Sequence, residues 1–171
     1  LYADPHPGNY RFLGDGKVGF LDFGCVKVLP HDLIAGMKRY MRAAMDADWP
    51  EFDRACVEVL AYDPDDESWD LYRSYTLQLL MPIMTKEPWV CSTESAREAV
   101  QYLSRGIRKI VFKEGELPQL PKVPKMPQDF TFVNRLQWGL ASVLAGLGTV
   151  ACFRDIMEGW VRDGVYPVPS E

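Results

Sequence analysis

The sequence predicts a mainly α-helical fold that carries one short β-hairpin near its beginning. After residue 30, apolar residues recur at intervals of three and four in several stretches, which is the period of an amphipathic helix. Before residue 30, two short apolar runs flank a turn containing glycine and aspartate, which is typical of a hairpin. The chain has 171 residues, 47% of them hydrophobic, which suffices for one domain with a buried core.

The predicted hairpin has its turn at Gly14–Lys17, between two apolar runs. With a four-residue turn, the numbers of facing residues sum to 31, so that Leu13 faces Val18. The same register places Asn9 opposite Asp22, just beyond the hairpin. Neighbouring strands lie about 4.7–4.9 Å apart, so an amide oxygen and a carboxylate are expected to converge there.

A second carboxylate is expected near the same point. Asp4 lies five residues before Asn9, and D-F-G follows at residues 22–24. D-x-x-x-x-N followed by D-F-G is the order of a kinase site, where the first Asp orients or deprotonates the attacking hydroxyl and the Asn and second Asp hold Mg²⁺. Such oxygen ligands, completed by phosphates and water, suit this ion. The alternative is a Pro/Gly-rich turn in which Asp4 and Asn9 only cap turns, but the joint spacing favours the kinase interpretation.

These residues resemble the signature of a known family. Ala3-Asp4-Pro5-His6-Pro7-Gly8-Asn9, together with Leu21-Asp22-Phe23-Gly24, is similar to the motif pair of the UbiB/AarF atypical kinase-like family, the ADCK group in eukaryotes. The similarity covers about residues 1–25, and a looser similarity extends to residues 127–135. It implies the C-terminal, helical lobe of a protein-kinase-like fold that uses Mg-ATP as an ATPase or unorthodox kinase.

The resemblance implies roles for individual residues. Asp4 matches the catalytic-loop aspartate, and Asn9 and Asp22 match the ligands of Mg²⁺. His6 and Gly24 complete the expected nucleotide-binding set, and His6 is expected to brace the loop in preference to contacting phosphate.

The sequence departs from a complete kinase site in two respects. Tyr2 stands where the family usually has a histidine, a difference that bears on the geometry of the loop more than on its chemistry. The chain contains no G-x-G-x-x-G and no V-A-I-K-like strand, and in the family the corresponding parts precede the catalytic loop. Since the chain begins at Leu1 in mid-motif, we expect it to be a fragment that binds nucleotide poorly by itself.

The resemblance also implies partners and a location. Many members of the family support ubiquinone or other isoprenoid-quinone metabolism, which implies ATP and an isoprenoid lipid or quinone precursor as partners. The implied location is cytoplasmic, with peripheral association at the inner face of a membrane.

Only about six residues separate Gly24 from the next predicted helix, too few for the activation segment of a peptide-phosphorylating kinase. A small-molecule kinase of the aminoglycoside or choline kinase type and a pseudo-kinase lipid-binding scaffold stay open as alternatives.

Composition excludes other classes of function. The chain has 24 acidic and 19 basic side chains, a formal charge of −5, and no basic stripe, so nucleic acid is not an expected partner. Its four cysteines form no C-x-x-C pair, which disfavours structural zinc and favours reduced thiols in a cytosolic protein.

Four helices are predicted in the first two thirds of the chain. Their expected ranges are 31–45, 48–61, 68–81 and 92–112. Asp48 is expected to cap the second helix, and Pro82 to end or kink the third near Met81. Solvent exposure is favoured over Ca²⁺ binding for the acidic segment 63–67. It is also favoured over an anionic lipid surface for the cations of the fourth helix.

The remainder is predicted to form a proline-rich strap and C-terminal helices. Residues 113–128 hold prolines at three-residue intervals, which favours an extended polyproline II strap over an SH3-type ligand. C-terminal helices are expected over residues 129–164. Within them, residues 136–153 form a stretch of 18 residues without a charge, which reaches the length of a membrane span. Its glycines favour a tightly packed core helix instead.

Overall fold

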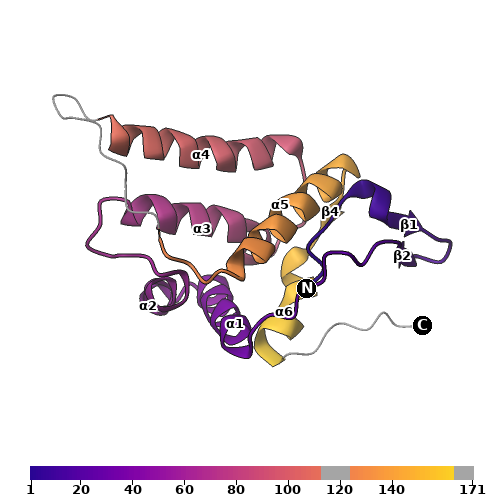
Figure 1. Cartoon of the computed structure of the whole chain (residues 1–171), viewed down its shortest axis with the longest axis horizontal. Helices are drawn as coiled ribbons and strands as arrows, with labels where there is room; N and C mark the ends of the chain where they lie inside the picture. Colours follow the sequence, from indigo (N-terminus) through magenta and orange to yellow (C-terminus); the bar gives the residue numbers. More distant parts are fainter. Residues whose placement is uncertain (113–123, 164–171) are drawn as a thin grey trace.

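Six helices and two small sheets make up the described part of the chain, residues 1–112 and 124–163, in the computed structural model (Figure 1). A 3₁₀ turn (Pro7–Asn9) leads into the hairpin of β1 (Tyr10–Phe12) and β2 (Val18–Phe20). The helices are α1 (His31–Asp46), α2 (Trp49–Leu60), α3 (Trp69–Met84), α4 (Thr93–Val111), α5 (Phe130–Gly146) and α6 (Phe153–Asp163). The predicted class, mainly α with one short β-hairpin, is confirmed.

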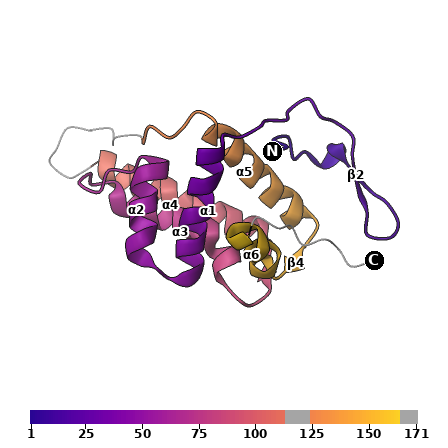
Figure 2. The same ribbon diagram turned by 90° about the horizontal axis from the view of Figure 1, so that it is seen from below.

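The hairpin lies apart from the helices, and α5 stands between them. Figure 1 shows α3 and α4 side by side, with α5 running obliquely between them and the hairpin. In Figure 2, turned by 90°, the hairpin again projects beyond α5 while the other helices gather on its far side. Through α5, the segment that holds the predicted site residues therefore meets the helical core.

The core lies where α1, α2, α3 and α6 meet. Its most deeply buried large side chains are Phe52, Leu60, Val161 and Cys56. α1 and α2 approach closely at Gly36, because a Cβ there would lie 2.7 Å from Val59. All four cysteines are free, and burial raises the pKa of the Cys56 thiol to about 12, so this thiol stays protonated at neutral pH.

The boundaries of three predicted helices agree with the structure to within two residues. Asp48 caps α2 as predicted, since its carboxylate accepts the N–H of Glu51 at 3.2 Å. The third prediction is wrong at its end, because α3 continues through Pro82 to Met84. Pro82 lacks the N–H that would bond the carbonyl of Gln78, but burial of Leu80 and Ile83 on either side keeps the last turn helical.

The predicted hairpin register is wrong by one residue. Phe12, not Leu13, pairs with Val18, and Tyr10 pairs with Phe20. The connection has five residues because Asp15 and Gly16 both adopt left-handed conformations, with φ of 65° and 71°, and the Leu13 N–H bonds the Lys17 carbonyl at 2.9 Å. A one-residue change of register moves every facing pair.

The uncharged stretch 136–153 does not form one helix. α5 ends at Gly146, and the chain turns at Gly148 (φ 61°) into β4 (Val150–Ala151). β4 pairs with β3 (Trp89–Val90) in a small antiparallel sheet that the sequence analysis did not anticipate. Among the helices of the described ranges, none is long and apolar enough to cross a membrane. Of the predicted strap, residues 113–123 lie outside the described residues.

The end of α1 is tied to α6 by an ion pair with two contacts. Arg162 donates to Asp46 Oδ1 at 2.6 Å and to Oδ2 at 3.1 Å, and these bonds hold the pKa of Asp46 below its ordinary value of 3.8. Because the pKa of the Asp46 carboxyl is lower in the folded state than in the unfolded state, the ion pair contributes its full stabilisation of the fold at pH values above the unfolded-state pKa. The stabilisation is lost as pH falls through the folded-state pKa.

We therefore predict that Asp46→Asn lowers the free energy of unfolding at pH 7 by about 0.5–1 kcal/mol, because the pair is partly exposed. The difference in the free energy of unfolding between the wild type and Asp46→Asn should shrink as the pH is lowered below 3.8. Urea unfolding at several pH values measures both effects, with Asp15→Asn in the exposed hairpin turn as the control. A deficit that does not change with pH would show that charge is not its cause.

Candidate functional site

The loop of residues 4–8 and the D-F-G turn lie in one gap between two paired segments. On one side of the gap, the Ala3 N–H bonds the Cys25 carbonyl at 2.9 Å, and Tyr2 forms a β-bridge with Val26. On the other side, the Leu21 N–H bonds the Asn9 carbonyl at 3.0 Å. The backbone therefore carries Asp4 and Asp22 into the same gap, although they are 18 positions apart in sequence.

The loop is also braced from within. His6 Nδ1 accepts the N–H of Gly8 at 3.1 Å, and the His6 carbonyl accepts the N–H of Asn9 at 2.9 Å. Pro5 is buried, whereas the His6 side chain is exposed. His6 thus fixes the 3₁₀ turn that delivers Asn9 to the site.

Asp4 and Asn9 are in direct contact. The Asn9 amide nitrogen donates to Asp4 Oδ2 at 3.1 Å and is 3.3 Å from the Asp4 carbonyl oxygen. Arg135 of α5 donates to the other carboxylate oxygen, Oδ1, at 2.8 Å. Both oxygens of Asp4 are therefore held, one from its own loop and one from a helix that lies 131 positions later.

Sequence reasoning did not select Arg135 as a site residue. A lone arginine on a mostly apolar helix carries no motif, and its partner is distant in sequence. The looser family similarity over residues 127–135, at whose last position Arg135 stands, was the one signal that could have pointed to it.

Helix α5 contacts the site segment at two further points. A Cβ added to Gly139 would lie 2.3 Å from Pro5 Cγ, so only glycine allows this approach of the loop to the helix. At the start of α5, Asp129 pairs with Lys27 at 2.8 Å, just after the D-F-G turn. Because Arg135 and Gly139 are four residues apart, they share the helix face that meets the loop.

Asp22 and Gly24 form a tight turn at the exposed side of the gap. Asp22 Oδ1 accepts the Gly24 N–H at 2.7 Å, and a Cβ at Gly24 would lie 3.1 Å from that oxygen. The predicted opposition of Asn9 and Asp22 is wrong, because the shifted register pairs Asn9 with Leu21 instead. The Asn9 side chain is turned towards Asp4.

Tyr2, at the position where the sequence analysis noted a missing histidine, packs against the hairpin. Its ring makes edge contacts with Tyr10 and Phe20, at centroid distances of 6.3 and 5.5 Å, and those two rings are 5.4 Å apart. Burial, with Tyr2 and Asp4 nearby, raises the pKa of Tyr10. An aromatic cluster therefore joins the segment before the loop to the hairpin that follows it.

The free side-chain oxygens of Asn9 and Asp22 are of the chemical type that a hard cation such as Mg²⁺ takes. Asn9 directs its nitrogen to Asp4, which leaves its carbonyl oxygen as an acceptor, and Asp22 is exposed with one oxygen outside the turn. Two protein oxygens are what Mg²⁺ takes when phosphates and water supply the rest. Within residues 1–112 and 124–163, no group of three or more His, Cys, Asp or Glu side chains could hold a metal ion.

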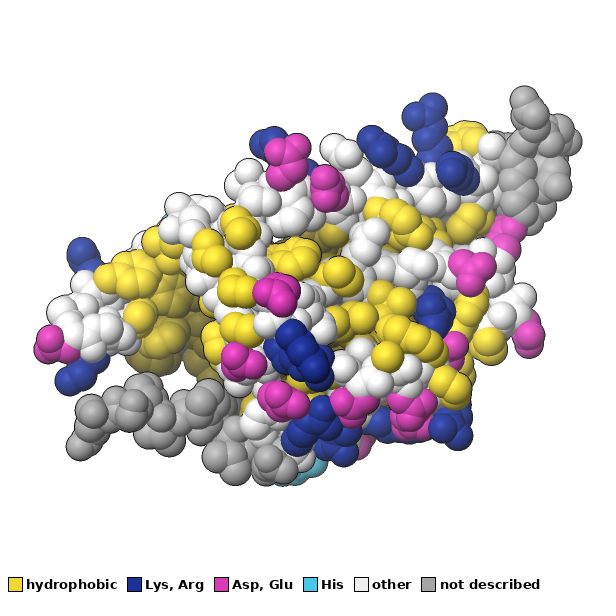
Figure 3. All heavy atoms as spheres, turned by 180° about the vertical axis from the view of Figure 1, so that it is seen from behind, with side chains coloured by type: hydrophobic (Ala, Val, Ile, Leu, Met, Phe, Trp, Pro, Cys, Tyr) yellow, Lys and Arg dark blue, Asp and Glu magenta, His cyan; other side chains and the backbone are white. Residues whose placement is uncertain are grey.

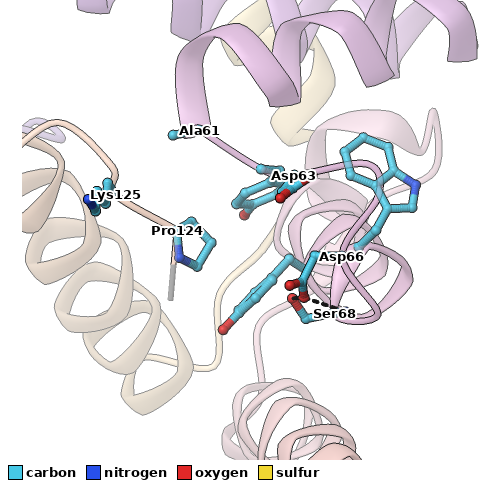
Figure 4. Close-up of a pocket in the computed structure, with 9 residues that line it drawn as sticks. Ala61, Asp63, Asp66, Ser68, Pro124 and Lys125 are labelled. Carbon is cyan, nitrogen blue, oxygen red and sulfur yellow. Dashed lines mark hydrogen bonds between the residues drawn. The ribbon is translucent and has the colours of Figure 1, made fainter. Parts of the chain in front are cut away.

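A pocket of about 430 Å³ lies at the end of the molecule away from the hairpin (Figures 1 and 4). The connection from α2 to α3 forms one side of it, and Pro124 and Lys125 form the other. Asp66 Oδ1 accepts hydrogen bonds from the backbone and hydroxyl of Ser68, at 2.9 and 2.5 Å, directly before α3. This carboxylate of the acidic segment 63–67 therefore fixes a turn.

Comparison with known proteins bears on the segment that holds the candidate site. Residues 1–55 match the family model of the ABC1 atypical kinase-like domain. This match confirms the resemblance at the residues that carry it, and it supports an atypical kinase family. The matched segment spans the loop, the hairpin, the D-F-G turn, α1 and about half of α2, close to a third of the chain. A search of curated proteins gave no match.

We predict that Gly139→Ala displaces the loop of residues 4–8 from α5, because the added methyl group overlaps Pro5. The expected cost is about 1–3 kcal/mol in the free energy of unfolding, as for other overpacked contacts. Gly146→Ala is the matched control on the same helix, since nothing lies within 4 Å of its added Cβ. That control should be neutral or more stable by up to about 1 kcal/mol. Denaturant unfolding compares the two, and equal effects would contradict the close contact.

Proposed function

We propose that this chain forms the catalytic-loop part of an atypical kinase or ATPase that uses Mg-ATP and acts in isoprenoid-quinone lipid metabolism, of the ubiquinone type. One observation carries the proposal. Asp4 and Asn9 are hydrogen-bonded to each other in a loop that the backbone holds beside the D-F-G turn, within the segment that matches an atypical kinase-like domain. Kinase chemistry depends mainly on positioning and on charge neutralisation, and this arrangement supplies the residues for both.

In this proposal Asp4 orients the attacking hydroxyl or water and accepts its proton. Its carboxylate is preset by Asn9 on one oxygen and by Arg135 on the other. Asn9 Oδ1 and Asp22 would hold Mg²⁺, which when bound neutralises the charge of the phosphates. His6 braces the loop, and Gly24 permits the turn that fixes Asp22.

The nucleotide would be covered by a second lobe that packs on the hairpin. Apolar side chains gather over the hairpin, at the left of Figure 3. Phe12, Phe20 and Phe23 are 64%, 47% and 68% exposed, respectively. Large apolar patches on a soluble surface mark places where another part of a protein packs.

The acceptor is proposed to be a lipid or a small molecule, not a peptide. α1 begins at His31, seven residues after Gly24, so no long activation segment intervenes. An isoprenoid lipid or quinone precursor is the proposed partner. The proposed location is the cytoplasm, with peripheral association at the inner face of a membrane.

A pseudo-kinase scaffold is a second candidate, and one contact favours it. Arg135 occupies Asp4 Oδ1, so a hydroxyl that approaches Asp4 must share or displace an ion pair. Nucleotide binding without turnover would identify the scaffold.

We predict that Asp22→Asn in the full-length protein weakens Mg-ATP binding about tenfold or more, because the amide loses the charge that attracts the cation. Calorimetric titration of ATP with and without Mg²⁺ measures this effect. Asp15→Asn, the same chemical change on an exposed turn of the hairpin, should bind Mg-ATP like the wild type. Equal affinities of wild type and Asp22→Asn would remove Asp22 from the site.

A further inference from the structure

The stretch of residues 5–9 uses almost all of its own hydrogen-bond donors. Two of its residues are prolines, which have no N–H. The His6 N–H donates to the Asp4 carbonyl at 2.7 Å, and the Gly8 N–H donates to His6 Nδ1 at 3.1 Å. The Asn9 N–H donates to the His6 carbonyl at 2.9 Å, and the Asn9 amide nitrogen is turned towards Asp4. Residues 5–9 therefore differ from the glycine-rich loops that cradle phosphates through free backbone N–H groups.

One donor is left in this stretch, and it belongs to the His6 ring. Nδ1 accepts the Gly8 N–H, so it carries a lone pair. In a neutral imidazole the proton then resides on the other nitrogen, Nε2. The His6 side chain is exposed, and within the described residues no acceptor is bonded to Nε2. Nε2–H is therefore the donor that residues 5–9 offer to a ligand.

The absence of a side chain at Gly8 keeps this ring in place. A Cβ at Gly8 would lie 3.1 Å from His6 Nδ1 and 3.4 Å from His6 Cε1. A larger residue would push the ring away from the Gly8 N–H. With glycine, the ring is fixed before any ligand arrives, and a donor that is already fixed loses little conformational freedom on binding.

We propose that His6 Nε2–H donates a hydrogen bond to an oxygen of the γ-phosphate of ATP, while His6 Nδ1 braces the loop. This inference rests on the proposed function. There, Asp4 accepts the proton of the group that attacks the γ-phosphate, and His6 is two residues from Asp4. Hydrogen bonds to an ionised oxygen are stronger than bonds between neutral groups, so one well-placed donor contributes measurably to binding.

Two substitutions in the full-length protein separate the roles of the two ring nitrogens. His6→Asn keeps an acceptor for the Gly8 N–H, because asparagine bonds such groups at the start of a helical turn, but it places no donor where Nε2 lies. His6→Ala removes both. The preference for Mg-ATP over Mg-ADP, measured by calorimetry, should fall about tenfold in both variants, because only ATP carries the γ-phosphate. Mg-ADP should bind to His6→Asn as to the wild type. His31→Asn, at an exposed histidine outside the loop, is the control and should leave both affinities unchanged.

Two measurements need no nucleotide. Nitrogen NMR of the imidazole rings, assigned by comparison with His6→Asn, shows which nitrogen carries the proton, and we expect Nε2. Amide hydrogen exchange at Gly8 should be as slow in His6→Asn as in the wild type and faster in His6→Ala, which reports the brace. Thermal melts show that each variant folds.

Two results would overturn the inference while leaving the proposed function intact. They are a His6 proton on Nδ1 and an unchanged preference for Mg-ATP over Mg-ADP in both His6 variants. In either case the wild type would still bind Mg-ATP, and Asp22→Asn would still weaken that binding. Absence of Mg-ATP binding by the folded wild type would overturn the proposed function and this inference together.

Discussion

The contact between α5 and the loop of residues 4–8 is the constraint on which the candidate site depends. Arg135 fixes one oxygen of Asp4, and Gly139 lets Pro5 approach the helix so closely that a methyl group would not fit between them. The pair of Asp129 with Lys27 holds the chain just after the D-F-G turn to the same helix. Without α5, the site would rest on a hairpin of two three-residue strands, which has little stability of its own.

Two arginines of α6 connect the ends of helices in the core. Arg154 of α6 donates to the carbonyls of Met45 and Met84, at 3.0 and 3.1 Å, and thereby joins the last turns of α1 and α3. Arg162 closes the same corner through Asp46. These arginines bond backbone carbonyls and a carboxylate near the ends of helices, where acceptors lack intrahelical partners. Helices that are connected in this way support a functional loop better than the contacts within the loop do.

α5 serves two different environments on its two faces. Arg135 and Gly139 face the polar loop, whereas Trp138, Ala141 and Leu144 line an apolar groove. The sequence of α5 therefore does not show the single apolar face of a simple amphipathic helix. One face carries an arginine and a glycine, and the other carries aromatic and aliphatic side chains. The buried residues of α5 are Phe130 and Val133, both near its start, where the helix enters the core.

The sequence by itself determined the local features of this protein. The D-x-x-x-x-N and D-F-G motifs, the hairpin and the caps at Asp48 and Ser92 depend on neighbouring residues, so they could be predicted without the fold. The tertiary structure decided whatever involves distant partners: the pair of Arg135 with Asp4, the approach of Gly139 to Pro5, the pairing of β3 with β4, and the helical end of α3 beyond Pro82. The predicted register of the hairpin was wrong because left-handed backbone at Asp15 and Gly16 lengthened the turn by one residue. Local patterns fix which residues are available, and packing fixes which of them meet.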